Sequence, residues 1–171
     1  MQLAKRLAIL FSGLALLGIA GSAAAQWTQH RFPEGYRIEY PGIPKAFQQE
    51  VQTQIGSIKI LTQSLNWNGL DFFSAYSQYP NEAPPERRLE GARDGAVRNV
   101  KGILREEQQL TVSGAPAKRI IVDVPNPRLV GVQLLVVRDN RLSQAVVVGP
   151  VGSESSPDVA RFINSFALEP R

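Results

Sequence analysis

The residues that could carry acid–base or nucleophilic chemistry are few in this sequence. It contains no cysteine and a single histidine, His30. Thiol catalysis and thiolate metal sites are therefore excluded. A serine hydrolase would need His30 as its base, but the chain lacks a Gly-x-Ser-x-Gly elbow, and nothing pairs His30 with a particular serine or aspartate. We interpret His30 as a surface or strand-edge residue and assign no catalytic residue.

Metal and cofactor sites find little support. Glu106 and Glu107 are adjacent on a predicted strand, so their carboxylates face opposite sides of a sheet. The loop from Glu154 to Asp158 lacks the spaced acidic ligands of an EF-hand, and a helix cap explains it more simply. No Gly-x-Gly-x-x-Gly or Gly-Lys-Ser/Thr phosphate loop occurs. We therefore predict no metal site and no cofactor.

Three sets of residues leave alternatives open. The 15 acidic residues offer many carboxylate pairs of the kind that glycoside hydrolases use, and the sequence does not give their separations. A basic set with acids interleaved is interpreted as a solvated helix face, with an anion site as the alternative: Arg87, Arg88, Arg93, Arg98 and Lys101. An aromatic set is interpreted as core, with a ligand groove as the alternative: Trp27, Tyr36, Tyr40, Trp67, Phe72, Phe73, Tyr76 and Tyr79.

The beginning of the chain has the layout of a secretory signal peptide. Lys5 and Arg6 precede an apolar run over 7–19, and small residues lead to a cleavage site after Ala25. The apolar run is shorter than the ~20 residues that span a bilayer. We therefore expect residues 1–25 to be a signal peptide and 26–171 to be a single exported domain, periplasmic or secreted, with no membrane span in the mature chain.

The distribution of charge argues against a nucleic-acid partner. Without Lys5 and Arg6 the chain has 17 basic and 15 acidic residues, and the sign alternates along most of its length. Nucleic-acid binding usually requires a concentrated basic face. We therefore predict no nucleic-acid partner.

Alternation of apolar and polar residues predicts strands along most of the mature chain. One covers 36–40, and we expect the proline-rich bend after it to lie near the sheet edge. Asn68 and Gly69 form a strong hairpin signal. Phe72 and Phe73 are neighbours on the next strand, so we expect both faces of the sheet to be covered. About seven or eight strands, mostly joined by short turns, indicate a mainly antiparallel sheet.

A helix is predicted over 85–100, where apolar residues recur at helical spacing. Asp94 and Arg98 are placed as an i,i+4 pair. Gly91 and Gly95 each cost a helix about 1 kcal/mol relative to alanine. We expect these small residues to let the helix lie close against the sheet.

A second helix is predicted after Ser156. Serine can cap it, Pro157 fits its first turn, and Asp158 favours its positive end. An apolar stripe follows: Val159, Phe162, Ile163 and Phe166. An antiparallel sheet with helices on its faces is an α+β layered fold.

Three motifs carry a family resemblance. They are a Tyr-Pro-Gly-x-Pro turn at 40–44, a Ser-Gly-x-Pro turn at 113–116, and a terminal Val-x-x-Phe-Ile-x-Ser-Phe helix at 159–166. With the order of the elements, they resemble the PsbP-like group, which includes exported bacterial proteins of unknown function, the extrinsic PsbP protein of photosystem II and a eukaryotic Ran-binding import factor. The resemblance implies an α+β fold over 26–171, with a mainly antiparallel sheet of about seven or eight strands sandwiched by helices in α/β/α layers.

The resemblance also implies a kind of function. Known relatives use this fold as a non-enzymatic surface that binds other proteins, and the analogy carries no functional residue to this chain. We therefore predict an exported, soluble, non-enzymatic accessory protein that binds another envelope or secreted protein. The alternative is small-molecule or lipid binding in a groove between helix 85–100 and the sheet. A carboxylate-dependent hydrolase is the third hypothesis.

Overall fold

The computed structural model describes residues 26–53 and 56–170. The predicted signal peptide, residues 1–25, lies outside the described residues. Within the described part, neither helix is long and apolar enough to cross a bilayer. The described chain forms two antiparallel sheets, two α-helices and one turn of 3-10 helix.

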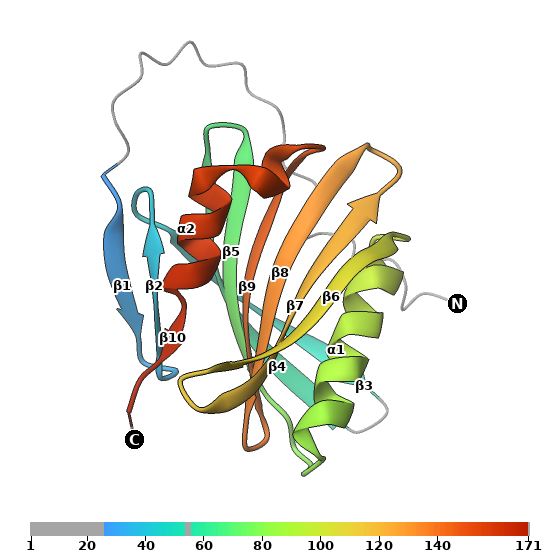
Figure 1. The fold of residues 1–171 in the computed structure, drawn as a ribbon. Coiled ribbons are helices and arrows are strands. Elements are labelled where there is room, and N and C mark those ends of the chain that lie inside the picture. Colours follow the sequence, from blue (N-terminus) through green and yellow to red (C-terminus); the bar gives the residue numbers. More distant parts are fainter. Residues whose placement is uncertain (1–25, 54–55, 171) are drawn as a thin grey trace.

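The main sheet has seven strands in the order β3-β4-β5-β9-β8-β7-β6 (Figure 1), and every neighbouring pair is antiparallel. This confirms the predicted α+β class and the mainly antiparallel sheet. The strands are β3 (Lys45–Thr53), β4 (Gly56–Trp67), β5 (Leu70–Gln78), β6 (Ile103–Val112), β7 (Ala115–Val124), β8 (Leu129–Arg138) and β9 (Arg141–Pro150).

The connection from β5 to β6 determines where the first helix lies. Because four antiparallel steps separate these strands in the sheet, β5 and β6 run in the same direction. Parallel strands need a crossover connection, and here it contains α1 (Pro85–Asn99). The predicted helix over 85–100 is thus confirmed to within a residue. It packs mainly against β7 and β8 on one face of the sheet.

A small sheet and the second helix cover the opposite face. The small sheet has the order β1-β2-β10, formed by β1 (Thr28–Phe32), β2 (Tyr36–Tyr40) and β10 (Ala167–Leu168). The 3-10 turn η3 (Ser153–Ser155) precedes α2 (Pro157–Ser165), whose predicted cap is confirmed because Ser156 Oγ accepts from the Val159 amide at 3.2 Å. Strand 36–40 therefore belongs to a separate sheet rather than to an edge of the main one.

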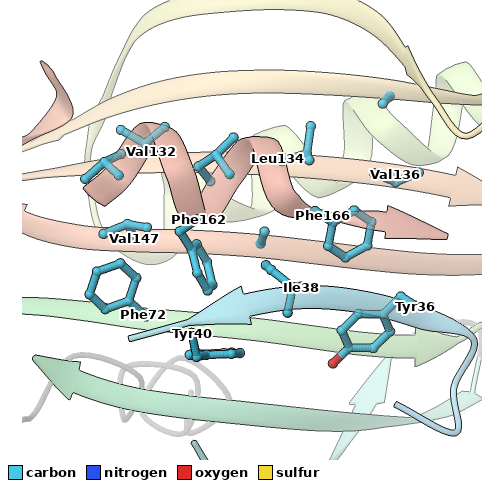
Figure 2. Close-up of a cluster of buried hydrophobic side chains, with 14 of the residues drawn as sticks. Tyr36, Ile38, Tyr40, Phe72, Val132, Leu134, Val136, Val147, Phe162 and Phe166 are labelled. Atoms are coloured by element: carbon cyan, nitrogen blue, oxygen red, sulfur yellow. The ribbon is translucent and has the colours of Figure 1, made fainter. Parts of the chain in front are cut away.

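Aromatic rings join β2 and α2 to the main sheet. Phe162 of α2 packs edge-on against Phe72 of β5 and Tyr40 of β2, with ring centroids 5.1 and 5.0 Å away. Figure 2 shows these rings together with Ile38, from β2, and with Val132 and Val147, from β8 and β9. All of these side chains are at most 1% exposed. This face of the sheet is a close-packed core.

Two tyrosines in this core have satisfied hydroxyl groups. Tyr40 donates a hydrogen bond to Ser74 Oγ at 2.9 Å, and the hydroxyls of Tyr36 and Ser74 are hydrogen-bonded at 3.0 Å. Burial raises the pKa of Tyr36 to about 12 and also raises the pKa of Tyr40, because both phenolates would lose their hydration.

We therefore predict that the free energy of unfolding falls between pH 10 and about pH 12. The unfolded chain releases the Tyr36 proton near its ordinary pKa of 10, whereas the folded chain holds it until about 12. Between its unfolded and folded pKa values, each such tyrosine lowers the free energy of unfolding by about 1.4 kcal/mol per pH unit. Below pH 10 its full contribution to stability is present. Urea titrations at several pH values measure this slope.

Tyr36→Phe is expected to make that slope shallower. Phe72→Leu destabilises the same core without removing a hydroxyl, so it serves as the control and should keep the original slope. A Tyr36→Phe protein with an unchanged slope would contradict the assignment.

The helix α1 contacts the other face of the main sheet through one buried apolar residue and a stripe of partly buried apolar residues. Leu89 is 3% exposed and packs with Leu135, Val137 and Leu142. Ala92, Ala96 and Val100 lie against the same cluster. The predicted pair between Asp94 and Arg98 is wrong: Asp94 instead lies 2.8 Å from Arg93, which also reaches Glu107 on β6.

The glycines of α1 do not serve close packing. A Cβ atom at Gly91 or Gly95 would meet nothing within 4 Å, so both glycines face open space. The expectation that they let the helix approach the sheet is wrong. Close approach occurs instead just after the helix, where a Cβ at Gly102 would lie 2.8 Å from the Asp123 backbone oxygen.

Alanine substitutions at Gly95 and at Gly102 are therefore predicted to change the free energy of unfolding in opposite directions. Gly95→Ala should raise the free energy of unfolding by about 1 kcal/mol, because it adds helix propensity without a clash. Gly102→Ala should lower it by about 1–3 kcal/mol, because the strand backbone cannot yield. Thermal and urea unfolding of both variants measure this; a loss of stability in Gly95→Ala would show that the helix face is not open.

Candidate functional site

One face of the main sheet is only partly covered. Neighbouring strands are about 4.8 Å apart, so seven strands span about 29 Å, whereas a helix with its side chains is about 10–12 Å wide. The helix α1 lies over β7 and β8. Consequently β5, β4, β3 and most of β9 have no helix over this face; on β9, Leu142 packs with Leu89 of α1.

The uncovered part of this face forms a groove of about 900 Å³ beside α1. This volume is within the range of ligand pockets, about 300–1,000 Å³. Because side chains alternate along a strand, Phe73 and Val146 line the groove while their neighbours Phe72 and Val147 point into the opposite core. The apolar floor comprises Val51, Ile58, Ile60, Phe73, Ala75, Val122, Val124, Val146 and Val148.

The wall that α1 contributes combines small residues with arginines. Gly91, Ala92, Gly95 and Ala96 line the groove, so this wall has little relief. Arg87 and Arg88, near the start of the helix, and Arg98, near its end, line it too. The groove thus extends along about 16 Å of α1, at about 1.5 Å per residue from Arg88 to Asn99.

Arg88 is the unusual member of this wall. It is 7% exposed, its guanidinium carbon lies 3.9 Å from the centroid of the Tyr79 ring, and its Nη2 donates to the Asn81 carbonyl at 2.8 Å. Its Nε has no hydrogen-bond partner within the described chain. No carboxylate among residues 26–53 and 56–170 lies within ion-pair distance of it. Buried arginines are rarely without a paired anion.

Polar groups on the groove floor come from four strands. Gln133 Nε2 on β8 donates to Gln144 Oε1 on β9 at 2.6 Å. On β4, Thr62 is 2% exposed and its hydroxyl has no partner among the described residues, and the same holds for the amide nitrogen of Gln49 on β3. The floor is therefore apolar with a few convergent polar groups, which is the pattern of a small-molecule site.

Carboxylates are scarce in the groove. Among the described residues that line it, Glu82 is the only acid. Glu107 is held elsewhere by Lys118 and Arg93, whose hydrogen bonds keep the pKa of its carboxyl below the usual value. A two-carboxylate hydrolase would need a second acid across the groove, and the lining does not supply one.

The other candidate residues are engaged in local structure. His30 lies on β1. Its Nε2 is 2.9 Å from Thr28 Oγ1 and 3.2 Å from the Gly42 carbonyl oxygen, so these contacts involve neither a serine nor a carboxylate. Glu154 pairs with Arg105 at 2.6 Å and accepts from the Gly152 amide. Within residues 26–53 and 56–170, no cluster of His, Asp and Glu could hold a metal ion.

The aromatic set divides between core and groove. Tyr36, Tyr40 and Phe72 are core, and Trp27, Trp67 and Tyr76 pack against it. Phe73 and Tyr79 line the groove and do not belong to the core around Phe72. For the basic set, the solvated-face interpretation is wrong at Arg88, which is buried. Arg88 precedes Ala92 by four residues, so helical spacing places it on the face of α1 that lies against the sheet, and that is the signal available in the sequence.

The described chain has an α+β fold with a groove on one face of its main sheet. No family model and no curated protein sequence matches the chain. Among solved structures, it is similar to cyanobacterial PsbP (CyanoP) from Synechocystis sp. PCC 6803, with a TM-score of 0.58 and 10% identity over 91% of this chain and 98% of that one. The predicted PsbP-like fold is thereby confirmed.

A second solved structure shows a weaker likeness. A protein of unknown function from Pseudomonas aeruginosa matches with a TM-score of 0.43 and 13% identity, over 78% of this chain and 90% of that one. At these identities the comparisons concern the fold alone. What the groove does must be argued from its own residues.

Proposed function

We propose that this chain is an exported, non-enzymatic binding protein whose groove between α1 and the main sheet holds an apolar or amphipathic small molecule. The observation that carries the proposal is the groove of about 900 Å³ with an apolar floor and few polar groups. Export rests on the predicted signal peptide at 1–25. The absence of cysteine and the single histidine support a role in binding rather than in catalysis.

The shape of α1 supports this proposal. Gly91 and Gly95 each lower helix stability, yet neither is needed for packing in the folded chain. A ligand lying against the helix would use the space that larger side chains would fill. The unpaired hydroxyl of Thr62 would gain a partner from a ligand with a polar group.

Filling the groove tests the proposal. Gly95→Leu keeps the helix and places a side chain in the groove, because a Cβ there meets nothing within 4 Å. The affinity of the fluorescent apolar probe N-phenyl-1-naphthylamine should fall about tenfold, equivalent to about 1.4 kcal/mol of binding free energy. Fluorescence titration of the purified mature protein measures it.

Glu90→Leu provides the matched control. Glu90 is exposed on the same helix and is not among the groove residues, so this variant adds the same side chain outside the site. It should bind the probe as the unaltered protein does. Equal losses in both variants, or none in either, would refute a binding site in the groove.

The second candidate function is the predicted binding of another envelope or secreted protein. The observation that favours it is apolar exposure beside an open sheet edge: Ile43 is 84% exposed just before β3, and Phe47 on β3 is 41% exposed. Within the described chain, β3 is an edge strand of the main sheet. An extended segment of a partner could pair with such an edge.

Site-specific cross-linking tests this second function. A photoreactive residue at Phe47 should give a reproducible protein adduct in the native cell envelope, identified by mass spectrometry, and Ile43→Asp should reduce the yield. The control position is Gln108, which is exposed on the opposite edge strand β6. The same adducts from both positions, or none from Phe47, would argue against a partner at this edge.

A further inference from the structure

Arg88 differs from the ion-paired arginines of the fold. Arg105 pairs with Asp123 and Glu154, and Arg161 pairs with Glu39 at 2.7 Å. Arg88, although 7% exposed, has a ring and a backbone carbonyl as its partners and no carboxylate among the described residues. A buried charge without a counter-ion is costly, and an anion beside it would offset that cost.

Two other arginines line the same groove. Arg87 lies at the same end as Arg88, and Arg98 lies near the other end of α1. Neither makes an ion pair with a described residue, and Glu82 is the single acid among the described lining residues. No side chain caps the N-terminus of the 15-residue α1, and Pro84, its N-cap, also lines the groove. The positive end of the helix dipole therefore lies beside Arg87 and Arg88.

The apolar floor runs away from this cationic end. The sheet register pairs Ser77 with Leu142 near Tyr79 and Arg88, and it pairs Asp71 with Val148 at the far end. Six residues of strand at about 3.3 Å each separate these two rows, so the floor is about 20 Å long. Phe73 and Val146 are paired between them and line the groove. A long groove with a buried arginine without an ion pair at one end and an apolar floor beyond it matches a chain-shaped molecule with an anionic head.

We propose that the ligand is a single-chain anionic amphiphile, whose carboxylate or phosphate head binds at Arg88 and whose hydrocarbon tail lies on the floor toward Val146 and Val148. This inference rests on the proposed function, since it names the ligand class of the same groove. Arg88 lines the groove and its guanidinium supplies the charge, while its Nε has no partner within the described chain. Arg87 and the helix dipole add to the positive potential.

Four probes with the same chain length test the ligand class. Dodecanoate, dodecyl phosphate, dodecanol and dodecylamine are titrated into the mature protein by calorimetry, below their micelle concentrations. The two anions should bind about tenfold to a hundredfold more tightly than the alcohol, as expected for a hydrogen bond to a charged group. The amine should bind more weakly than the alcohol.

Arg88→Met tests the position of the head group. This variant replaces the arginine with an unbranched apolar side chain. It should reduce the affinity for dodecanoate to the affinity for dodecanol, and the affinity for dodecanol should change by less than about twofold. Arg161→Met is the matched control, because Arg161 also lies over an aromatic ring, Trp27, but on the α2 side of the fold. It should leave all four affinities unchanged. Circular dichroism and thermal unfolding confirm that both variants fold.

The outcomes separate this inference from the proposed function. If dodecanol binds as tightly as the anions, the groove binds apolar molecules and the anionic class is wrong. If Arg88→Met folds and retains the preference for anions, the head group does not bind at Arg88 and the inference is overturned. If none of the four probes binds, both the inference and the small-molecule function fail. Preference for one anion over the other identifies a carboxylate or a phosphate head.

Discussion

A mismatch in width determines this structure: one helix cannot cover seven strands. The crossover from β5 to β6 must pass over the sheet, and α1 is the only helix in that connection. It lies over β7 and β8, so the sheet on the β3 side stays without a helix. The apolar side chains that β3, β4, β5 and β9 present there form most of the groove floor, and Val122 and Val124 of β7 complete it beside α1.

The opposite face explains why the groove floor can remain in place without cover. Strand β2, with Tyr36 and Tyr40, and helix α2, with Phe162 and Phe166, pack against that face and bury its side chains. The hydroxyls of both tyrosines are satisfied by Ser74, so the polar atoms of the core have partners. Each strand is thus held from one side while alternate residues on the other side face the groove.

The same residues show how far the sequence alone leads. Alternation, turn residues and the Ser156 cap are local signals, so the class of fold and both helices could be predicted from them. The placement of β2 in a separate sheet could not be predicted, because an alternating pattern does not indicate which sheet a strand joins. The roles of Gly91 and Gly95 could not be predicted either, because small residues serve close packing and open space alike. Helical spacing alone does not fix the burial of Arg88, because that burial depends on contacts with Tyr79 and Asn81 that only the folded chain provides.

Two neighbouring residues offer the most direct test that a ligand binds on the groove face. Val146 lines the groove and Val147 lies in the opposite core, although they are consecutive on β9. Methyl NMR spectra of the mature protein titrated with dodecanoate report on both side chains separately. We predict methyl chemical shift changes at Val146, Val148 and Ile58, whereas the methyl signals of Val147 and Val159 should stay nearly unchanged. Shifts concentrated at Val147 and Val159, or none at any of the five, would contradict this prediction.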